Sequence, residues 1–381
     1  MNPRVLVLTL SSFAFGSGAL IFSGLLEFMA ADLGVSAGAA GQIQTTYVLT
    51  AALAGPPLAI LAGRFDRKKV LLVALTLTIV LNLICMATSS FAQLLVFRAM
   101  IGACAALAGP ASSAAVSGLV PPEMRGRALA MVGGGMTIAF VLGIPLGTII
   151  GSIFTWRAAF AMAAGLAAVA FVAIALILPS VKPPPPAMGG RLTWNATPLF
   201  LATFLAFAAN MSMNIYIAPV LRVGSDITGQ GVAAFQLLIG VGSFLGLSLG
   251  GRAADKGWGG LSITLAYAGL ITAAALHWVV LHHWLSPGWP TWILVGLAYV
   301  VMATALFSVM PVVQTRLMAR APNAAPLALA LNGSSASMGQ ALAGATGGAV
   351  LATVGTPSLP LATITYAAIA LLIWRLWEAK R

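Results

Sequence analysis

Lys182-Pro-Pro-Pro-Pro-Ala-Met-Gly-Gly-Arg191 is the only proline-rich segment of this 381-residue chain. Four consecutive prolines favour a stiff, extended polyproline II conformation, which is typical of a spacer between two packed regions. Six long apolar stretches precede this segment and six follow it. The sequence therefore predicts an N-terminal half over residues 1–181, a linker over 182–195 and a C-terminal half over 196–381.

The apolar stretches are long enough to cross a membrane, because about 20 apolar residues span the hydrocarbon core. Of all residues, 60% are hydrophobic and 7% are charged, whereas soluble domains carry about 25% charged residues. The sequence thus predicts an all-α membrane protein with twelve transmembrane helices. They are expected near residues 5–27, 41–62, 70–90, 92–119, 128–152, 158–178, 196–220, 231–250, 260–283, 290–314, 327–353 and 359–376.

The positive charges predict the orientation, because Lys and Arg accumulate in cytoplasmic loops. With these spans, sixteen Lys and Arg residues fall on one side, whereas the other side has only Arg157 and Arg222. We therefore expect both termini in the cytoplasm and a multi-pass protein. The net charge of +12 is explained by this topology, because the basic loops are short and nothing else favours nucleic-acid binding.

Glycines recur at intervals of four in two of the predicted helices. One series is Gly143, Gly147 and Gly151, with Pro145 inside it, and the other is Gly242, Gly246 and Gly250. Small residues at this spacing allow two helices to approach closely. Two interpretations stay open: ordinary helix packing, or a rocking contact between the two halves.

The loops after the second and eighth predicted helices are similar. They read Gly63-Arg64-Phe65-Asp66-Arg67 and Gly251-Arg252-Ala253-Ala254-Asp255-Lys256. Matching loops at matching places indicate duplicated halves, a common plan of transporters whose substrate site lies between the halves.

These features together resemble the major facilitator superfamily, and more closely its bacterial drug:proton antiporter and sugar-efflux branch. The resemblance is carried by Gly24–Ser36, Ala62–Lys69, Arg98 with Gly102, Leu142–Thr148, Trp156–Phe160, Tyr216–Pro219 and Gly250–Asp255. It implies a secondary transporter of the bacterial inner membrane that exports small organic, drug- or sugar-like compounds by alternating access in exchange for protons. It implies no enzymatic activity, no cofactor and no metal, and we expect a monomer.

The sequence departs from that branch at two places. The signature loop usually has an acidic residue where this chain has Gly63, and a glycine where it has Asp66. The glutamate that related efflux proteins carry in the middle of the first helix is absent near Ala19, and the nearest acid is Glu27. The coupling residue of that branch therefore does not transfer directly.

Ionisable groups within a membrane are costly and indicate function. Glu27 and Arg98 are the two candidates, and their expected depths predict a pair that couples protonation to the access state; Asp66 and Asp255 are further gating candidates. Glu27 at the membrane interface and Arg98 tied to backbone carbonyls are the structural alternatives. Asn210, Asn214, Tyr216 and Asn332 are expected either to contact substrate or to join helices.

Two other functions remain open. A facilitator or importer without ion coupling would show solute flux that is insensitive to an imposed pH gradient. A membrane-embedded enzyme would need clustered acids, bases or metal ligands, and the chain has only seven acidic residues.

The charge asymmetry makes a topological prediction. Single cysteines at positions 2, 188 and 379 should resist impermeant thiol reagents in intact cells, because all three positions are expected in the cytoplasm. Rapid labelling of any one of them would reject this orientation.

Overall fold

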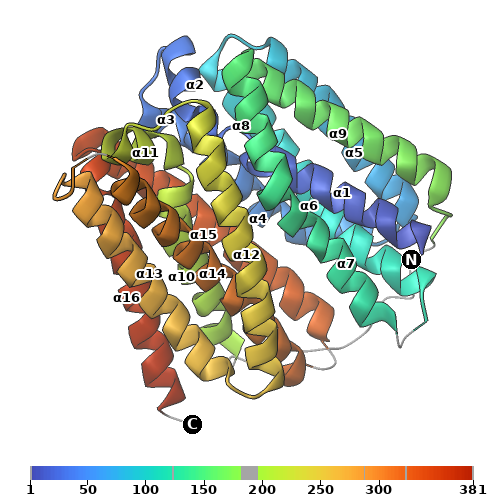
Figure 1. Ribbon diagram of the computed structural model, residues 1–381. Helices are drawn as coiled ribbons and strands as arrows, with labels where there is room; N and C mark the ends of the chain where they lie inside the picture. Colours follow the sequence, from blue (N-terminus) through green and yellow to red (C-terminus); the bar gives the residue numbers. More distant parts are fainter. Residues whose placement is uncertain (1, 122–123, 182–195, 287, 322–323, 380–381) are drawn as a thin grey trace.

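The computed structural model describes residues 2–121, 124–181, 196–286, 288–321 and 324–379, and its helices form two bundles (Figure 1). The first bundle contains α1 (Pro3–Leu20), η1 (Ser23–Leu25), α2 (Leu26–Asp32), α3 (Ala37–Ala40), α4 (Gln42–Ala62), α5 (Arg67–Ala87), α6 (Phe91–Leu119), α7 (Arg125–Ile138), η3 (Ala139–Gly143), α8 (Ile144–Ile153) and α9 (Trp156–Ile177). The second contains α10 (Thr197–Asn214), α11 (Ile217–Ser225), α12 (Gln230–Asp255), α13 (Gly259–Leu281), α14 (Trp289–Arg320), α15 (Ala325–Thr353), η6 (Thr356–Ser358) and α16 (Leu359–Glu378). The predicted linker, 182–195, lies outside the described residues.

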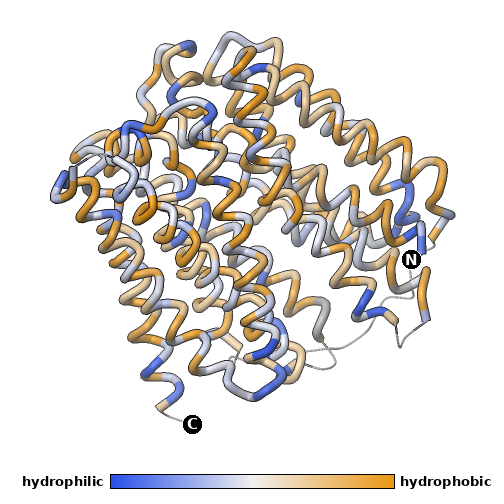
Figure 2. Tube along the Cα trace, in the orientation of Figure 1, coloured by the Kyte–Doolittle hydropathy of each residue, from blue (hydrophilic) through white to orange (hydrophobic). Residues whose placement is uncertain are grey.

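Each bundle supplies six spans, and the twelve-helix, all-α fold expected from the sequence is confirmed. Within the described ranges, nine helical segments are long and apolar enough to cross a membrane, and α10 with α11 makes a tenth. The other two spans are α4 and α15. Figure 2 shows hydrophobic residues along both bundles and hydrophilic residues gathered near helix ends.

The two ends of the molecule differ in an obvious way. The end that carries α2, α3 and α11 is called the apex here, and the end with both termini and the loop between α12 and α13 is called the base (Figure 1). The bundles meet at the apex and diverge toward the base. In the first bundle, the base loop after α4 docks on the end of α9, because the Arg67 amide donates to the Val181 carbonyl at 3.0 Å.

Two spans predicted as continuous helices are interrupted. The first span breaks after α1, and the seventh bends by 52° between α10 and α11. Pro219 explains the second break, because it has no N–H to donate to the carbonyl of Ile215 one turn earlier. The fifth span contains the π-helical turn η3, in which the Ile144 amide donates to the Ala139 carbonyl just before Pro145.

The glycine series lie on contacts within each bundle. Gly143, Gly147 and Gly151 face Ser17, Ile21 and Leu25 of the first span. Gly242, Gly246 and Gly250 face α14, and a Cβ on Gly242 would lie 2.5 Å from the carbonyl oxygen of Val300. The interpretation as a rocking contact between halves is therefore wrong in this structure, and ordinary helix packing is what both series provide.

This packing predicts a sharp difference between two glycines of α12. Gly246→Leu should lower the free energy of unfolding by about 1–3 kcal/mol or more, because the added side chain meets the backbone of α14 at Thr304. Gly251→Leu should have little effect, because a Cβ there meets nothing within 4 Å. Thermal unfolding of the purified variants measures both. Equal melting temperatures would contradict the packing of α12 on α14.

Candidate functional site

The two bundles touch along two lines of contact, which together we call the seam. On one side, α3 and α4 pack on α15, and on the other, η3 and α8 pack on α12. Glycines allow the closest approach, since a Cβ on Gly38 would lie 2.5 Å from the carbonyl oxygen of Gly348, and one on Gly240 would lie 2.6 Å from the Cα of Val141. Bulkier residues would separate the bundles at these points.

Tyr216 fills the first side of the seam near the apex. Its fully buried ring lies against Gly41 of the other bundle and against Gly347 of its own. Its hydroxyl donates to the Gly344 carbonyl at 2.6 Å, and Gln42 donates to the same oxygen at 3.1 Å from across the seam. Tyr216 was expected to contact substrate or to join helices, and in this structure it joins helices.

Gln236 forms the second polar contact of the seam. This buried side chain of α12 accepts a hydrogen bond from the Thr148 hydroxyl at 2.7 Å and donates to Ser23 at 3.1 Å. Sequence reasoning missed Gln236 and Thr148. Gln236 could have been recognised as a polar residue within a predicted span. Thr148 is the last residue of the Leu142–Thr148 motif but was not identified as a candidate.

A small cavity lies beside Gln236, at the point where the seam closes. Its volume is about 20 Å³, which is enough for a single water molecule. Both bundles contribute to its wall, which is formed by Leu20, Ser23, Phe140, Ile144, Asn214, Ile217, Gln236 and Ile239. The polar groups among them are one hydroxyl and two amides, so no lining side chain is charged.

Glu27 and Arg222 form an ion pair across the two bundles at the apex. Glu27 Oε1 lies 2.6 Å from Arg222 Nε, and the side chains are 28% and 52% exposed. An exposed pair of this kind contributes about 0–1 kcal/mol. The pair therefore adds little to the stability of the closed apex, which depends mainly on the packing of the seam.

Arg98 has no acidic partner among the residues that the structure describes, and it is fully buried within the first bundle. Its guanidinium donates to the carbonyls of Gly18 at 2.9 Å and Ala19 at 2.8 Å, at the end of α1. It lies between the rings of Phe22 and Tyr47, with centroid distances of 5.1 and 4.5 Å. The predicted Glu27–Arg98 pair is therefore not formed, because each residue has other partners, and the alternative of carbonyl binding holds for Arg98.

The two loop acids have different surroundings. Burial raises the pKa of Asp66 as the largest single influence, but hydrogen bonds from the Ser180 hydroxyl at 2.6 Å and the Lys69 amide at 3.1 Å contribute to a net lowering. The ionised form of this carboxylate is thus stabilised by the hydrogen bonds that hold the loop in place. Asp255 lies at the exposed base end of α12.

The three candidate asparagines are engaged within the second bundle. Asn210 donates to the Met302 carbonyl at 2.8 Å, and Asn214 donates to the Asn210 side chain at 2.7 Å. Asn332 accepts from Thr203 at 2.7 Å. Of these asparagines only Asn214 also borders the cavity at the seam.

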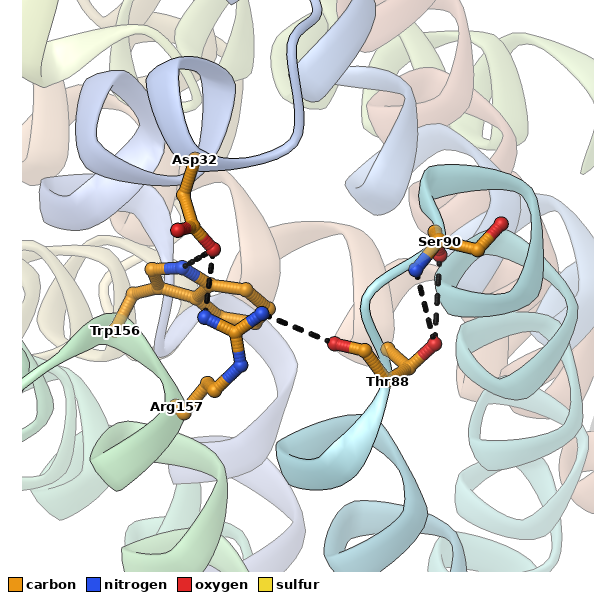
Figure 3. A network of polar contacts seen from close by, with 5 residues as sticks. All are labelled: Asp32, Thr88, Ser90, Trp156 and Arg157. Carbon is orange, nitrogen blue, oxygen red and sulfur yellow. Dashed lines mark hydrogen bonds and ion pairs between the residues drawn. The ribbon is translucent and has the colours of Figure 1, made fainter.

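A further polar network holds the apex of the first bundle together (Figure 3). Asp32 accepts from Arg157 at 2.6 Å and from the indole of Trp156 at 3.0 Å, while Arg157 also donates to the Thr88 carbonyl at 3.2 Å. The network ties the ends of the first, third and sixth spans to one another.

Residues 7–325 match the sequence profile of the Major Facilitator Superfamily, and the chain belongs to this family of transporters. It is therefore a transport protein rather than an enzyme, and a multi-pass membrane protein.

Two relatives are named for transport. The chain is 27% identical to the inner membrane transport protein YdhP of Escherichia coli K12 over 379 residues, covering 98% of this chain and 95% of that protein. It is 29% identical to the purine ribonucleoside efflux pump NepI of Escherichia coli O157:H7 over 295 residues, covering 72% and 74%. The crystal structure of a bacterial homologue of the lysosomal transporter Spinster, inward-facing and occupied, has the same fold, with a TM-score of 0.77, 17% identity and coverage of 98% and 96%.

The ion pair at the apex allows a charge-reversal prediction. Glu27→Arg opposes Arg222 with a second cation and should raise the rate at which Ile239→Cys in the seam is labelled, in vesicles whose apex side faces the thiol reagent. The expected increase is about fivefold, the population change that corresponds to about 1 kcal/mol.

Adding Arg222→Glu should return labelling to the original rate, because the pair is restored with its charges exchanged. Glu378→Arg is the matched control, since Glu378 pairs with Arg316 inside the second bundle, at 3.4 Å. Failure of the double reversal to restore the rate would show that the pair does not bridge the bundles.

Proposed function

We propose that this protein exports small, uncharged, hydrogen-bonding solutes from the bacterial cytoplasm across the inner membrane by alternating access, in exchange for protons. The observation that carries the proposal is that the bundles are joined at the apex and separate at the base. Cross-bundle hydrogen bonds and the Glu27–Arg222 pair involve the apex and the middle of the spans. Toward the base, a Cβ on Gly333 of the seam helix α15, or on Gly133 or Gly134 of α7, which leads into η3, would meet nothing within 4 Å.

The charge distribution supports a cytoplasmic location of the base. The described ends of the chain and the basic loop between α12 and α13 lie at this end (Figure 1), and Arg157 and Arg222 lie at the apex. Lys and Arg are retained on the cytoplasmic side during membrane insertion. With this orientation, the arrangement corresponds to a state that receives solute from the cytoplasm.

The chemistry of the seam favours uncharged solutes. Asn214, Gln236 and Ser23 present amide and hydroxyl groups at the closing point, while Arg98 is enclosed by two aromatic rings. A cationic drug bound here would lose its hydration without gaining a carboxylate, which is costly in an apolar environment. Nucleosides and sugars have the hydroxyl groups that amides bind, and the relative NepI is named for the efflux of a nucleoside.

Glu27 is our candidate for proton coupling. In this structure its carboxylate is paired with Arg222 across the seam. Opening of the apex separates the two residues, which leaves the carboxylate without its cation and in contact with the external medium. The carboxylate therefore has its cationic partner only while the apex is closed, and this difference between the two states makes Glu27 the candidate link between proton movement and the access state.

Efflux from cells that overproduce the protein tests the substrate class and the coupling. Cells preloaded with labelled inosine, a labelled sugar or a fluorescent cationic dye should lose the nucleoside or the sugar several times faster than control cells. A protonophore should abolish the difference. Glu27→Gln should reduce this efflux at least fivefold at equal protein levels, whereas Glu378→Gln, which removes a carboxylate paired within one bundle, should not.

Each alternative gives a different result. Efflux that is insensitive to the protonophore would indicate an uncoupled facilitator, and net accumulation would indicate an importer. Export of the dye alone would contradict the proposed substrate class. Full proton-driven efflux by Glu27→Gln would remove Glu27 as the coupling group while leaving the transport function intact.

A further inference from the structure

A groove lies in the second bundle, away from the seam, between α12 and α13. Both helices pack extensively on α14 but make few contacts with each other. Figure 1 shows them diverging from their common loop at the base, with α14 behind them. The space between them forms a groove of about 540 Å³, which is within the size range of pockets that hold ligands.

The groove is apolar along most of its length. Its sides carry exposed side chains of Leu249, Leu261 and Leu265, with exposed fractions of 52%, 59% and 60%. Small residues form its floor, namely Ala253, Ala266, Gly269, Ala305 and Ser308. Exposed leucines on membrane-spanning helices face the hydrocarbon, so the groove is open to lipid tails and matches their chemistry.

The base end of the groove is basic. Arg252 and Lys256 both line it, together with Trp258, and the Lys256 amine lies 5.0 Å from the centre of the Trp258 ring. Within the described ranges, neither cation forms an ion pair. Asp255 lies on the same turn of α12 but does not line the groove. Two cations therefore lie at the membrane interface, next to a tryptophan, and neither has an acidic partner in the described part of the chain.

The matching loop of the first bundle differs in how its charged side chains are used. Arg67 donates to the Ala62 carbonyl at 3.0 Å, Lys68 donates to the Ala175 carbonyl at 2.7 Å, and Asp66 accepts from Ser180. These three charged side chains are used in contacts within the protein. Arg252 and Lys256 make no such hydrogen bonds in the described part of the chain, so their charges are available to a ligand.

We propose that this groove binds one anionic phospholipid of the cytoplasmic leaflet. Its phosphate contacts Arg252 and Lys256, and an acyl chain lies along α14 between α12 and α13. Basic clusters at the cytoplasmic ends of helices attract anionic head groups, and the apolar floor excludes a water-soluble phosphate compound from the rest of the groove. The choice of the cytoplasmic leaflet depends on the orientation given under the proposed function. The binding of an anionic lipid does not depend on it.

Native mass spectrometry of the purified full chain in detergent tests the proposal directly. The probes are phosphatidylglycerol and phosphatidylethanolamine with identical acyl chains. The wild-type chain should retain phosphatidylglycerol at lower lipid concentration than phosphatidylethanolamine. The double variant Arg252→Gln/Lys256→Gln should weaken retention of phosphatidylglycerol about tenfold, because each cation near an anionic head group contributes to binding.

Two matched controls separate the groove from general charge and general bulk. Arg4→Gln/Arg375→Gln removes the same charge from exposed positions at the base outside the groove and should leave retention unchanged. Gly269→Leu fills the groove and should weaken retention of both lipids, whereas Gly165→Leu adds the same bulk where a Cβ meets nothing within 4 Å.

The charge variants decide the result even if Gly269→Leu does not fold. Equal retention of phosphatidylglycerol by the wild type and the Arg252→Gln/Lys256→Gln variant would overturn the proposal. An equal loss in the Arg4→Gln/Arg375→Gln variant would also overturn it, because binding would then depend on overall charge. Absence of efflux by the wild-type protein, with phosphatidylglycerol still retained, would count against the proposed function alone.

Discussion

Close backbone contact between the two bundles is the constraint on which the rest of the arrangement depends. Gly38 against Gly348, Gly41 against Tyr216, and Gly240 against Val141 are contacts that no larger side chain fits. Apolar helices gain little from association in lipid, so packing at short range must hold them together. Because these contacts occur near the apex and in the middle of the spans, the bundles remain separate at the base.

The breaks in the spanning helices follow from the same environment. A carbonyl without a hydrogen bond is costly in the hydrocarbon, so a helix can break only where another group satisfies it. Arg98 donates to the carbonyls of Gly18 and Ala19, which are at the end of α1. The break places Ser23 and Glu27 on the short segments η1 and α2, and both residues then reach partners in the other bundle.

The chain has few charged residues, and the corresponding base loops of the two halves use them differently. The base loop of the first bundle uses Asp66, Arg67 and Lys68 in contacts within the protein. The corresponding loop of the second bundle leaves Arg252 and Lys256 beside an apolar groove. Similar loop sequences therefore serve different purposes, because the first loop is hydrogen-bonded to α9 and to Ser180 and Val181 after it, while the side chains of Arg252 and Lys256 have no such bonds in the described residues.

The sequence by itself determined that the chain crosses a membrane twelve times in two halves, because its long apolar stretches, separated by charged, polar or Gly/Pro-rich turns, each match the thickness of a bilayer. It also identified the residues that resemble the family's motifs. Only the tertiary structure decided the partners: Glu27 binds Arg222 instead of Arg98, and the glycine series pack within bundles instead of between them. Residue spacing gives depth along a helix and the face of that helix, but not which neighbour lies opposite that face. The choice between neighbours is made by packing across residues far apart in the chain, such as Ser23, Thr148 and Gln236, which no local pattern connects.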